Sequence, residues 1–370
     1  MAIDKRGKRY RARYNGACAA FGRKTDAERW ITQQKIEQET LKYLPSKIEE
    51  HTVKELFEIW MENHAQIKKA STSIVRDYQI FRDYIGPHIG NIKCHHVSNS
   101  QVEHIVTALK KEARLSDKSI NNIITLIKTL FNYGLKKNYL LRSPALGISK
   151  FRIDENGYSY WDKNDALQFL RFAKNKYTKD KTFYVFYLTA LHTGMRLGEI
   201  ISLKWDCVDL EQKIITVSRT YDPIAKDIKD TTKGRRTRFV GIPDALIHEL
   251  RELKCNKPKS EFVFSNQVGH FLDPNNLRSR NFERDVKEAG VKRIRIHDMR
   301  HTFASHYVMS NGEPYVLKSL LGHQDIKTTM KYAHLDPDHV LKTTNIVDYG
   351  MNIPEKTKDN VVAFKRVVQN

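Results

Sequence analysis

Apolar residues recur at intervals of three and four between residues 53 and 131, which is the spacing of one face of a helix. The pattern predicts four amphipathic helices, of which the first begins with the capping-box pair Thr52 and Glu55 and the second ends at Gly86-Pro87. The predicted core positions are Val53, Leu56, Phe57, Trp60 and Met61, then Ile74, Val75, Tyr78, Phe81 and Ile85, then Val102, Ile105, Val106 and Leu109, and last Ile120, Ile123, Ile124, Ile127, Leu130 and Phe131. We expect a compact helical domain at residues 49–150.

Residues 1–25 show a different pattern, in which arginines alternate with aromatic and small residues. The run KRYRARYN is followed by Gly16 and ACAAFG, which indicates a short hairpin with one basic face. Thr25-Asp26 is expected to cap a helix over residues 27–44. A disordered basic tail is the alternative, but the alternation and the aromatic residues favour a small sheet that lies on DNA. Residues 1–48 are therefore predicted to form a basic unit with a linking helix.

After Ser143-Pro144 and the polar residues 153–157, which indicate a linker, the pattern becomes mixed. A helix is expected over residues 163–173, and a long apolar helix follows, interrupted at Thr193-Gly194. Strand signals at 214–221 and 236–243 flank a polar, flexible loop, and helices resume from Asn276. The predicted fold class is mainly α and multi-domain, with one small antiparallel sheet in a third domain at 158–345 and a tail at 346–370.

Charge narrows the choice of partner. The chain has 64 Lys and Arg against 43 Asp and Glu, a net charge of +21 and a pI of about 9.6, which is typical of a protein that meets phosphates. Solubility or an anionic membrane surface is the alternative, and the scattered lysines of residues 49–150 are either a solvated face or DNA contacts.

Other classes of protein are disfavoured. No apolar run is long enough to cross a bilayer, and MAIDKRGKRY is not a secretory signal. The four cysteines are far apart and form no CxxC pair, which disfavours a zinc site or a disulfide framework. We expect a cytoplasmic protein without a metal or other cofactor.

The candidate chemistry lies between Ile296 and His334. This stretch contains His297, Arg300 and His323, and then Tyr332 nine residues further on, with no acidic cluster suited to a metal. A phosphate attacked by a phenol requires donors and cations around its free oxygens and a hydroxyl in line with the bond that breaks. The pattern therefore suggests a nucleophilic tyrosine that acts on DNA.

Four motifs make the interpretation specific: ALHTGMRLGEI, TTKGRRTRFVGI, HDMRHTFAS and LLGHQDIKTTMKYAH. Their order and approximate separations resemble those of the tyrosine recombinase, or phage integrase, family over about residues 160–345. Upstream, the chain looks more loosely like the arm-binding and core-binding domains of integrases from phages and conjugative elements. One such motif alone is weak evidence for the family, whereas the occurrence of all four in the same order is strong evidence.

The resemblance implies roles for seven residues. Arg196 and Arg300 would grip the scissile phosphate with planar, permanently charged guanidinium groups. His297 and His323 would donate to the same oxygens or shuttle a proton, and Glu199 would orient the cations. Tyr332 would be the nucleophile, with cationic surroundings that lower the cost of ionising it. The seventh residue is Lys233.

Lys233 would be the general acid, since it falls in a loop between two predicted strands. The register of Thr232-Lys233-Gly234 favours it over Lys226 and Lys229, although Gly234 and Gly241 depart from the family pattern. The residues expected to contact DNA elsewhere are Arg9, Arg11, Arg13, Lys24, Arg235 and Arg236.

Structural alternatives stay open for several of these residues. Arg196 could cap a neighbouring helix, Arg300 could bridge to Asp298 or Glu199, and Tyr332 could be a packing residue. Three further histidines, His192, His301 and His306, are interpreted as structural hydrogen-bonding residues.

The implied activity is that of a site-specific recombinase that integrates or excises a phage or other mobile element. Tyr332 would form a 3′-phosphotyrosyl link without ATP or metal, and a homotetramer would exchange strands through a Holliday junction. The expected partners are double-stranded DNA with core and arm sites, an excisionase and a host DNA-bending protein, with no membrane. The 346–370 tail would pack on a neighbouring protomer or in cis. A type IB topoisomerase and a DNA-binding regulator are the alternative functions.

Overall fold

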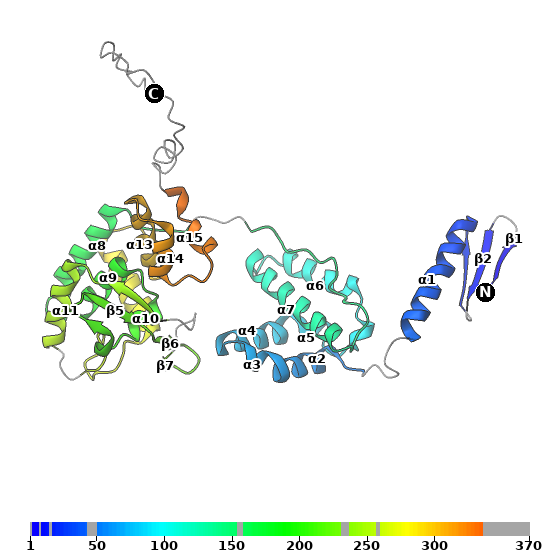
Figure 1. The fold of residues 1–370 in the computed structure, drawn as a ribbon, viewed down its shortest axis with the longest axis horizontal. Helices are drawn as coiled ribbons and strands as arrows, with labels where there is room; N and C mark the ends of the chain where they lie inside the picture. The colour runs from blue at the N-terminus through cyan, green and yellow to red at the C-terminus, as the bar shows by residue number, and fades with distance from the viewer. Residues whose placement is uncertain are drawn as a thin grey trace, which may run out of the picture. The chain divides into compact units, whose positions relative to one another are not determined.

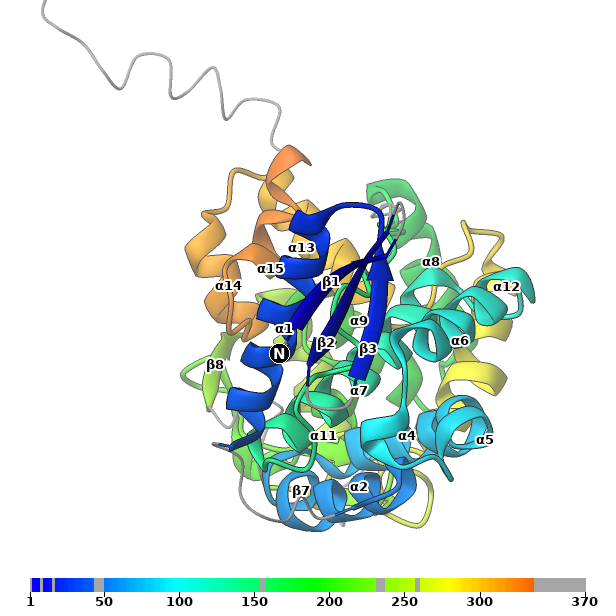
Figure 2. The ribbon, with the colours of Figure 1, turned by 90° about the vertical axis from the view of Figure 1, so that its right-hand side faces the viewer.

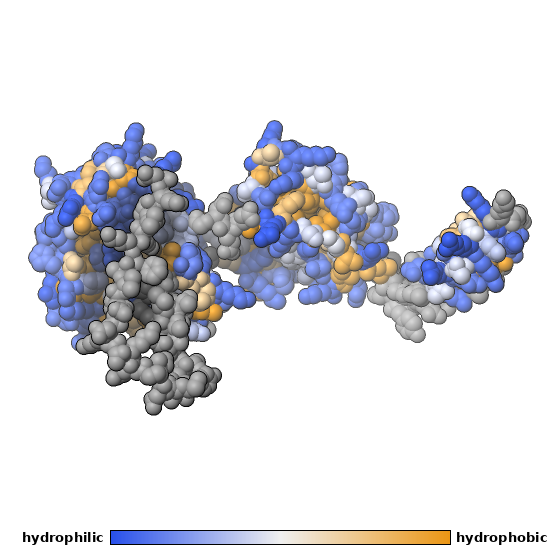
Figure 3. All heavy atoms as spheres, turned by 90° about the horizontal axis from the view of Figure 1, so that it is seen from above, coloured by the Kyte–Doolittle hydropathy of each residue, from blue (hydrophilic) through white to orange (hydrophobic). Residues whose placement is uncertain are grey.

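The computed structural model describes residues 2–6, 9–14, 17–42, 50–153, 158–230, 237–256 and 260–335. Two compact units make up the chain, Met1–Glu155 and Asn156–Asn370. Lys233, Arg235, Arg236 and the 346–370 tail lie outside the described residues. Hydrophilic residues dominate the visible faces of the described parts (Figure 3), and no described helix combines the length and the apolarity that a membrane crossing requires.

The first unit begins with a three-stranded antiparallel sheet, β1 (Ala2–Arg6), β2 (Arg9–Tyr14) and β3 (Ala17–Phe21), in the order β1-β2-β3. Helix α1 (Lys24–Lys42) lies along this sheet (Figures 1 and 2) and buries Ala12 of the central strand. The predicted hairpin is thus part of a sheet of three strands. The helix begins before the Thr25-Asp26 pair that was expected to cap it, so that Asp26 lies in its first turn.

The rest of this unit is the predicted helical bundle. Its helical segments are α2 (Val53–Trp60), η1 (Met61–Ala65), α3 (Gln66–Lys68), α4 (Ser71–Ile80), η2 (Phe81–Ile85), α5 (Gly86–Ile89), η3 (Cys94–His96), α6 (Asn99–Lys111) and α7 (Asp117–Lys136). The capping box at Thr52 and Glu55 is present. All predicted core positions of the first, third and fourth helices are buried.

The second helix of the bundle departs from the prediction in two ways. Gly86-Pro87 does not end it, because the backbone continues through the π turn η2 into α5. Proline is tolerated there, since it occupies the first turn of α5, where its missing N–H is not needed. Val75 and Tyr78, which were predicted to be core residues, are exposed.

The second unit, Asn156–Asn370, is mostly helical. Its described elements are α8 (Lys163–Lys176), α9 (Thr182–Thr193), α10 (Leu197–Ile201), η4 (Trp205–Cys207), β4 (Val208–Asp209), β5 (Ile214–Val217), β6 (Thr220–Asp222), β7 (Asp227–Lys229), β8 (Arg238–Gly241), α11 (Asp244–Asn256), η5 (Asn276–Phe282), α12 (Glu283–Ala289), α13 (Asp298–Met309), α14 (Pro314–Leu321), α15 (Lys327–Met330) and η6 (Ala333–Leu335). The buried α9 lies at the centre, packed against α8, α10, α11 and α13 (Figure 1).

The prediction of one sheet in this unit is wrong. β4, β5 and β8 form one antiparallel sheet, and β6 pairs with β7 in a separate ribbon. The predicted strand over 214–221 is divided between the two, and Asp227–Lys229 is a strand inside the segment predicted as a flexible loop. Pairing of β7 with Thr220–Asp222 in a local hairpin satisfies its backbone groups, which a polar composition does not reveal.

Candidate active site

Gly194 ends α9 and turns the chain toward the candidate site. It adopts a left-handed backbone with φ of +61°, and a Cβ at this position would lie 2.3 Å from the ring of Phe303. Glycine is required for two reasons. Residues with a side chain disfavour this left-handed backbone, and the Phe303 ring leaves no space for a Cβ atom. The turn directs the Gly194 carbonyl to Arg300, which donates to it at 2.8 Å from Nη1.

Three arginines converge on the C-terminal end of α14. Arg238 Nε donates to the Leu320 carbonyl at 2.7 Å, Arg300 Nη2 to the Leu321 carbonyl at 2.7 Å, and Arg196 Nη2 to the Gly322 carbonyl at 3.2 Å. The last carbonyls of a helix lack partners within it and carry the negative end of its dipole, so guanidinium groups satisfy both needs. The end of α14 therefore assembles cations that lie far apart in the sequence.

Glu199 ties two of these arginines together. Its Oε1 and Oε2 accept hydrogen bonds from Arg238 Nη1 and Nη2 at 2.9 and 2.6 Å, and Oε1 also accepts from Arg196 Nη1 at 2.9 Å. Burial opposes ionisation of this carboxyl group, but the Arg238 and Arg196 guanidinium groups outweigh it and lower its pKa to about 2. The carboxylate is thus charged at neutral pH and fixes the orientation of both guanidinium groups.

Arg300 is the most deeply placed of the three arginines, with 4% of its surface exposed. Burial, and then the charge of Arg196, lower the pKa of Arg300 to about 9, so it keeps its charge at neutral pH. Its hydrogen bonds go to Gly194 and Leu321, and neither Asp298 nor Glu199 accepts from it. Asp298 instead pairs with Arg295. The predicted alternative of an Arg300 bridge to one of these carboxylates is therefore wrong.

His297 and His323 are both kept neutral near these cations. Burial, followed by the charge of Arg300, lowers the pKa of His297 below its usual value. The same two causes, with Arg196 added, lower the pKa of His323 to about 3. His323 Nδ1 lies 2.8 Å from the Thr329 hydroxyl. When that hydroxyl donates to Nδ1, the proton of the neutral ring is on Nε2, the nitrogen that can donate to a further group.

Tyr332 is almost fully buried, with 1% of its surface exposed. Its hydroxyl oxygen lies 2.6 Å from His301 Nδ1. Burial raises the pKa of Tyr332 well above its usual value, and the opposing attraction of Arg300 is smaller. Arg300 lowers the cost of ionising this phenol, as expected of cationic surroundings, but in this conformation desolvation exceeds that attraction and the net effect is a raised pKa.

Tyr158 and Lys331 complete the surroundings of the phenol. The Tyr158 ring stacks on His301 at 4.9 Å between centroids and meets the Tyr332 ring edge-on at 4.8 Å. Lys331 Nζ lies 4.9 Å from the centroid of the Tyr332 ring. Burial, and then the charges of Lys331 and His297, lower the pKa of His301 to about 4. The neutral imidazole can therefore accept a hydrogen bond from the phenol.

Sequence reasoning assigned no role to Arg238 and interpreted His301 as a structural histidine, yet both belong to this cluster. Arg238 lies in the quoted motif TTKGRRTRFVGI, and it is the residue that binds both oxygens of Glu199. His301 follows Arg300 and is four residues after His297, which places it on the same face of α13. This four-residue spacing was the feature of the sequence that could have identified His301 as part of the site. The other two structural histidines, His192 and His306, bond to the carbonyls of Leu188 and Trp161.

The expected DNA contacts of the N-terminal sheet share one face. Arg9, Arg11 and Arg13 alternate along β2 with Tyr10, Ala12 and Tyr14, which belong to the apolar cluster against α1. Arg11 also donates from Nε to Cys18 Sγ at 2.8 Å, and Arg13 lies 3.4 Å from Asp4. Lys24 begins α1 and lies 3.6 Å from Glu28.

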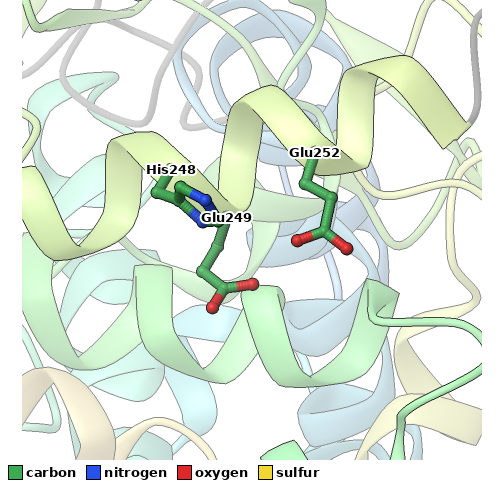
Figure 4. Close-up of side chains that lie close together, drawn as sticks. All are labelled: His248, Glu249 and Glu252. Atoms are coloured by element: carbon green, nitrogen blue, oxygen red, sulfur yellow. The ribbon is translucent and has the colours of Figure 1, made fainter.

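One group of potential metal ligands occurs among the described residues, on α11. It consists of His248, Glu249 and Glu252, whose ligand atoms lie within 4.8 Å of one another (Figure 4). Both carboxylates are engaged by lysines: Glu252 lies 2.6 Å from Lys181 Nζ, and Glu249 lies 3.4 Å from the same atom. This group contains none of the expected catalytic residues, and its ion pairs attach α11 to the start of α9.

The cluster therefore combines three guanidinium groups, two neutral imidazoles beside them and a phenol paired with a third imidazole. Such an arrangement suits an anion with several oxygens, because fixed donors and positive charges lower the energy of charge that builds up during a reaction. A buried phenol beside a neutral imidazole has an acceptor for its proton.

Comparisons with known proteins agree with this chemistry. Residues 160–339 match the model of the phage integrase family. A XerC-like tyrosine recombinase of Caldanaerobacter subterraneus subsp. tengcongensis is 25% identical over 332 residues, which cover 80% of this chain and 82% of the relative. The ICEBs1 integrase of Bacillus subtilis is 26% identical over 242 residues, 61% of this chain and 64% of the relative.

Solved structures show the same fold. The Tn1549 transposon integrase in complex with a circular intermediate DNA aligns with a TM-score of 0.67 and 19% identity, covering 76% of this chain and 94% of that one. A lambda integrase tetramer bound to a Holliday junction aligns with a TM-score of 0.59 and 15% identity, covering 87% and 95%. The motifs, the family match over residues 160–339 and the two sequence relatives together show that the chain belongs to the tyrosine recombinase, or phage integrase, family of enzymes that cleave and rejoin DNA at specific sites.

Proposed function

We propose that this recombinase integrates and excises a mobile element, such as a phage genome or a conjugative element, in the cytoplasm of its host. The observation that carries the proposal is the convergence of Arg196, Arg238 and Arg300 on one helix end, beside Glu199 and the two neutral histidines. The similarity to the ICEBs1 integrase supports a mobile element.

In this proposal the phosphate of the scissile bond binds at the cation cluster. Arg196 and Arg300 hold its two non-bridging oxygens, and Glu199 and Arg238 keep Arg196 in place. The side chain of Arg196 is 27% exposed, which leaves it accessible to DNA. His323 donates from Nε2 and His297 from its protonated ring nitrogen. All of these donors gain strength as negative charge builds up on the phosphate.

Tyr332 then attacks phosphorus, and the bond from phosphorus to the 5′ oxygen breaks. His301 Nδ1 accepts the phenol proton, since it already lies within hydrogen-bond distance. Lys233 donates a proton to the departing 5′ oxygen. The products are a 3′-phosphotyrosyl enzyme and a free 5′ hydroxyl, and attack by a 5′ hydroxyl of the partner strand reverses the step. The energy of the broken bond is kept in the new phosphodiester, so neither ATP nor metal takes part.

The wider assembly in this proposal is a homotetramer that exchanges strands through a Holliday junction. The tetrameric lambda integrase bound to such a junction shares the fold and supports this assembly. The basic face of β2, with Arg9, Arg11 and Arg13, binds arm sites, and Lys24, Arg235 and Arg236 add backbone contacts. An excisionase and a host DNA-bending protein set the direction of the reaction. The 346–370 tail packs on the neighbouring protomer.

The test uses a nicked duplex that traps covalent intermediates, built from the DNA flanking the gene and incubated with the full chain in EDTA. Wild type is expected to form an SDS-resistant adduct with DNA. Tyr332→Phe should bind the same duplex and form none. Tyr315→Phe is the matched control, because this tyrosine is 72% exposed and lies outside the cluster; it should form the adduct normally. An adduct with Tyr332→Phe would show that another residue is the nucleophile.

A second assay separates the recombinase from the two alternative functions. Two duplexes that carry the site should yield recombinant products with wild type. Relaxation of supercoiled plasmid without recombinant products would instead support a type IB topoisomerase. Binding without any adduct would support a DNA-binding regulator.

A further inference from the structure

Helix α7 of the bundle carries a continuous polar stripe. Lys118, Asn122, Thr125, Thr129, Asn132 and Lys136 recur at intervals of four and three residues, so they share one helix face, and all six are at least partly exposed. Lysines occupy both ends of the stripe, whereas amides and hydroxyls fill the middle. At about 1.5 Å per residue, the two lysines are separated by roughly 27 Å of helix.

The charge of α7 differs from that of its neighbours. No acidic residue follows Asp117 in this helix, and Asp117 itself pairs with Lys110. By contrast, the α2 and η1 segment exposes Glu55, Glu58 and Glu62 against one lysine, Lys54. A polyanion is therefore attracted to α7 and not to α2.

A hollow of about 250 Å³ opens beside the stripe, between α7 and α4. Its lining includes Arg76 of α4 and Asn122 of α7, together with Ser73, Thr125 and Thr129. The hollow is partly open to solvent, so the two helices frame a concave polar surface.

Arg76 and Asn122 differ from most of the other polar residues of the hollow. Lys69 donates to Asp77 at 2.6 Å and lies over the Trp60 ring, and the hydroxyls of Thr125 and Thr129 donate to carbonyls one turn earlier in α7. Within the described part of the chain, the side chains of Ser73, Arg76 and Asn122 make no hydrogen bond or ion pair, and only Arg76 and Asn122 among them can form two hydrogen bonds to one base edge.

Asn121, the neighbour of Asn122, shows what a structural asparagine does in this bundle. It is buried, and its amide bonds to both the N–H and the carbonyl of Phe151, at 2.8 and 2.9 Å. Folding therefore uses the amide of Asn121 and leaves that of Asn122 for a ligand.

We propose that Arg76 of α4 and Asn122 of α7 determine the sequence preference of the bundle by reading major-groove base edges of the core-site duplex. Arginine pairs in bidentate fashion with O6 and N7 of guanine, and asparagine with N6 and N7 of adenine, while the groove is wide enough for one helix. Lys118 and Lys136, at the ends of the stripe, contact phosphates and position the helix. This inference rests on the proposed function, because it assumes a specific duplex site.

In the experiment, the full-length protein is mixed with a pool of duplexes whose central base pairs are randomised. The duplexes that it binds are then recovered and sequenced. Wild type is expected to enrich guanine and adenine at fixed positions. Arg76→Ala and Arg76→Lys should each lose the guanine, and Asn122→Ala the adenine, with other positions retained. On the wild-type consensus duplex their affinity should fall about 5- to 100-fold, the range of one bidentate base contact. Lys118→Ala should weaken binding to all sequences and reduce the salt slope by about 1.

Lys54→Ala, on the acidic α2, is the control and should leave affinity and preference unchanged. The inference is overturned when the Arg76 and Asn122 variants keep the wild-type preference, or when they weaken all sequences equally. Failure of the proposed function gives a different result, in which wild type enriches no sequence and forms no covalent adduct. All variants change exposed or partly exposed side chains, and thermal unfolding checks that they fold as wild type does.

Discussion

His301 Nδ1 lies 2.6 Å from the hydroxyl oxygen of Tyr332, and both side chains contact the ring of Tyr158. The two residues are 31 positions apart, on α13 and just after α15. The neutral imidazole satisfies a buried phenol whose raised pKa keeps it protonated. In this conformation Tyr332 is therefore held as a protonated phenol whose proton has a defined acceptor.

The first prediction concerns His301→Ala. Loss of the acceptor leaves the buried phenol without a partner, which should lower the free energy of unfolding by about 1–3 kcal/mol. If His301 also takes the proton of Tyr332, adduct formation at pH 7 should slow about 100-fold or more. Urea unfolding and the nicked-duplex assay measure the two effects. His306→Ala removes a comparable hydrogen bond from the same helix, to the Trp161 carbonyl, and should spare the cleavage rate. Equal cleavage rates in the two variants would argue against proton transfer to His301.

The second prediction concerns Glu199→Gln. This change leaves the guanidinium groups of Arg238 and Arg196 without their shared counter-charge, and the Glu199 side chain is only 1% exposed. Breaking a buried ion pair from one side costs about 3–5 kcal/mol, so unfolding stability should fall by that amount and adduct formation should be largely lost. Glu211→Gln breaks the exposed pair with Arg251 and should change stability by less than about 1 kcal/mol. A Glu199 variant as stable as wild type would refute the anchoring role.

The third prediction separates two reasons for a glycine at position 194. Gly194→Ala faces both a left-handed backbone and an overlap with Phe303, and should lose about 3 kcal/mol or more of unfolding stability. Gly269 has a φ of +87° with no atom within 4 Å of the added Cβ. Gly269→Ala should therefore lose only the backbone contribution, about 1–2 kcal/mol. Similar losses in the two variants would mean that the Phe303 ring moves aside without cost.

The fourth prediction concerns stability between pH 7 and pH 5. His301 and His323 have folded-state pKa values of about 4 and about 3, below the ordinary value of 6.5. Between pH 6.5 and 4 the unfolded chain therefore binds more protons than the folded chain, and the free energy of unfolding must fall as the pH falls. Urea unfolding at a series of pH values measures the slope.

A matched pair of variants assigns that slope to the buried histidines. The double variant His301→Gln and His323→Gln should show a shallower fall from pH 7 to pH 5 than wild type does. His270→Gln changes an exposed histidine and should keep the wild-type slope. Glu199 adds its own dependence only below about pH 4.5, because its pKa is lowered. An unchanged slope in the double variant would contradict the assignment.

Much of the fold was predictable because its signals are local. The spacing of apolar residues in the bundle depends only on the 3.6-residue period of a helix, and nearly all of the predicted core is buried. The same holds for the turn at Thr193-Gly194, where α9 ends. The motifs that carry Arg196, Arg300, His323 and Tyr332 also indicated the family before any distance was known.

Only the tertiary structure decided how the candidate site is held together. β5 pairs with β8, which follows it in the chain only after the β6–β7 hairpin, so the strand signals alone did not reveal two sheets. The partners of Arg238 and His301 are 39 and 31 residues away, on other elements. The raised pKa of Tyr332 follows from desolvation, which depends on everything packed around the ring. The sequence by itself determined which functional side chains are available for the chemistry. The packing of α13 and α14 determined which of these side chains contact one another.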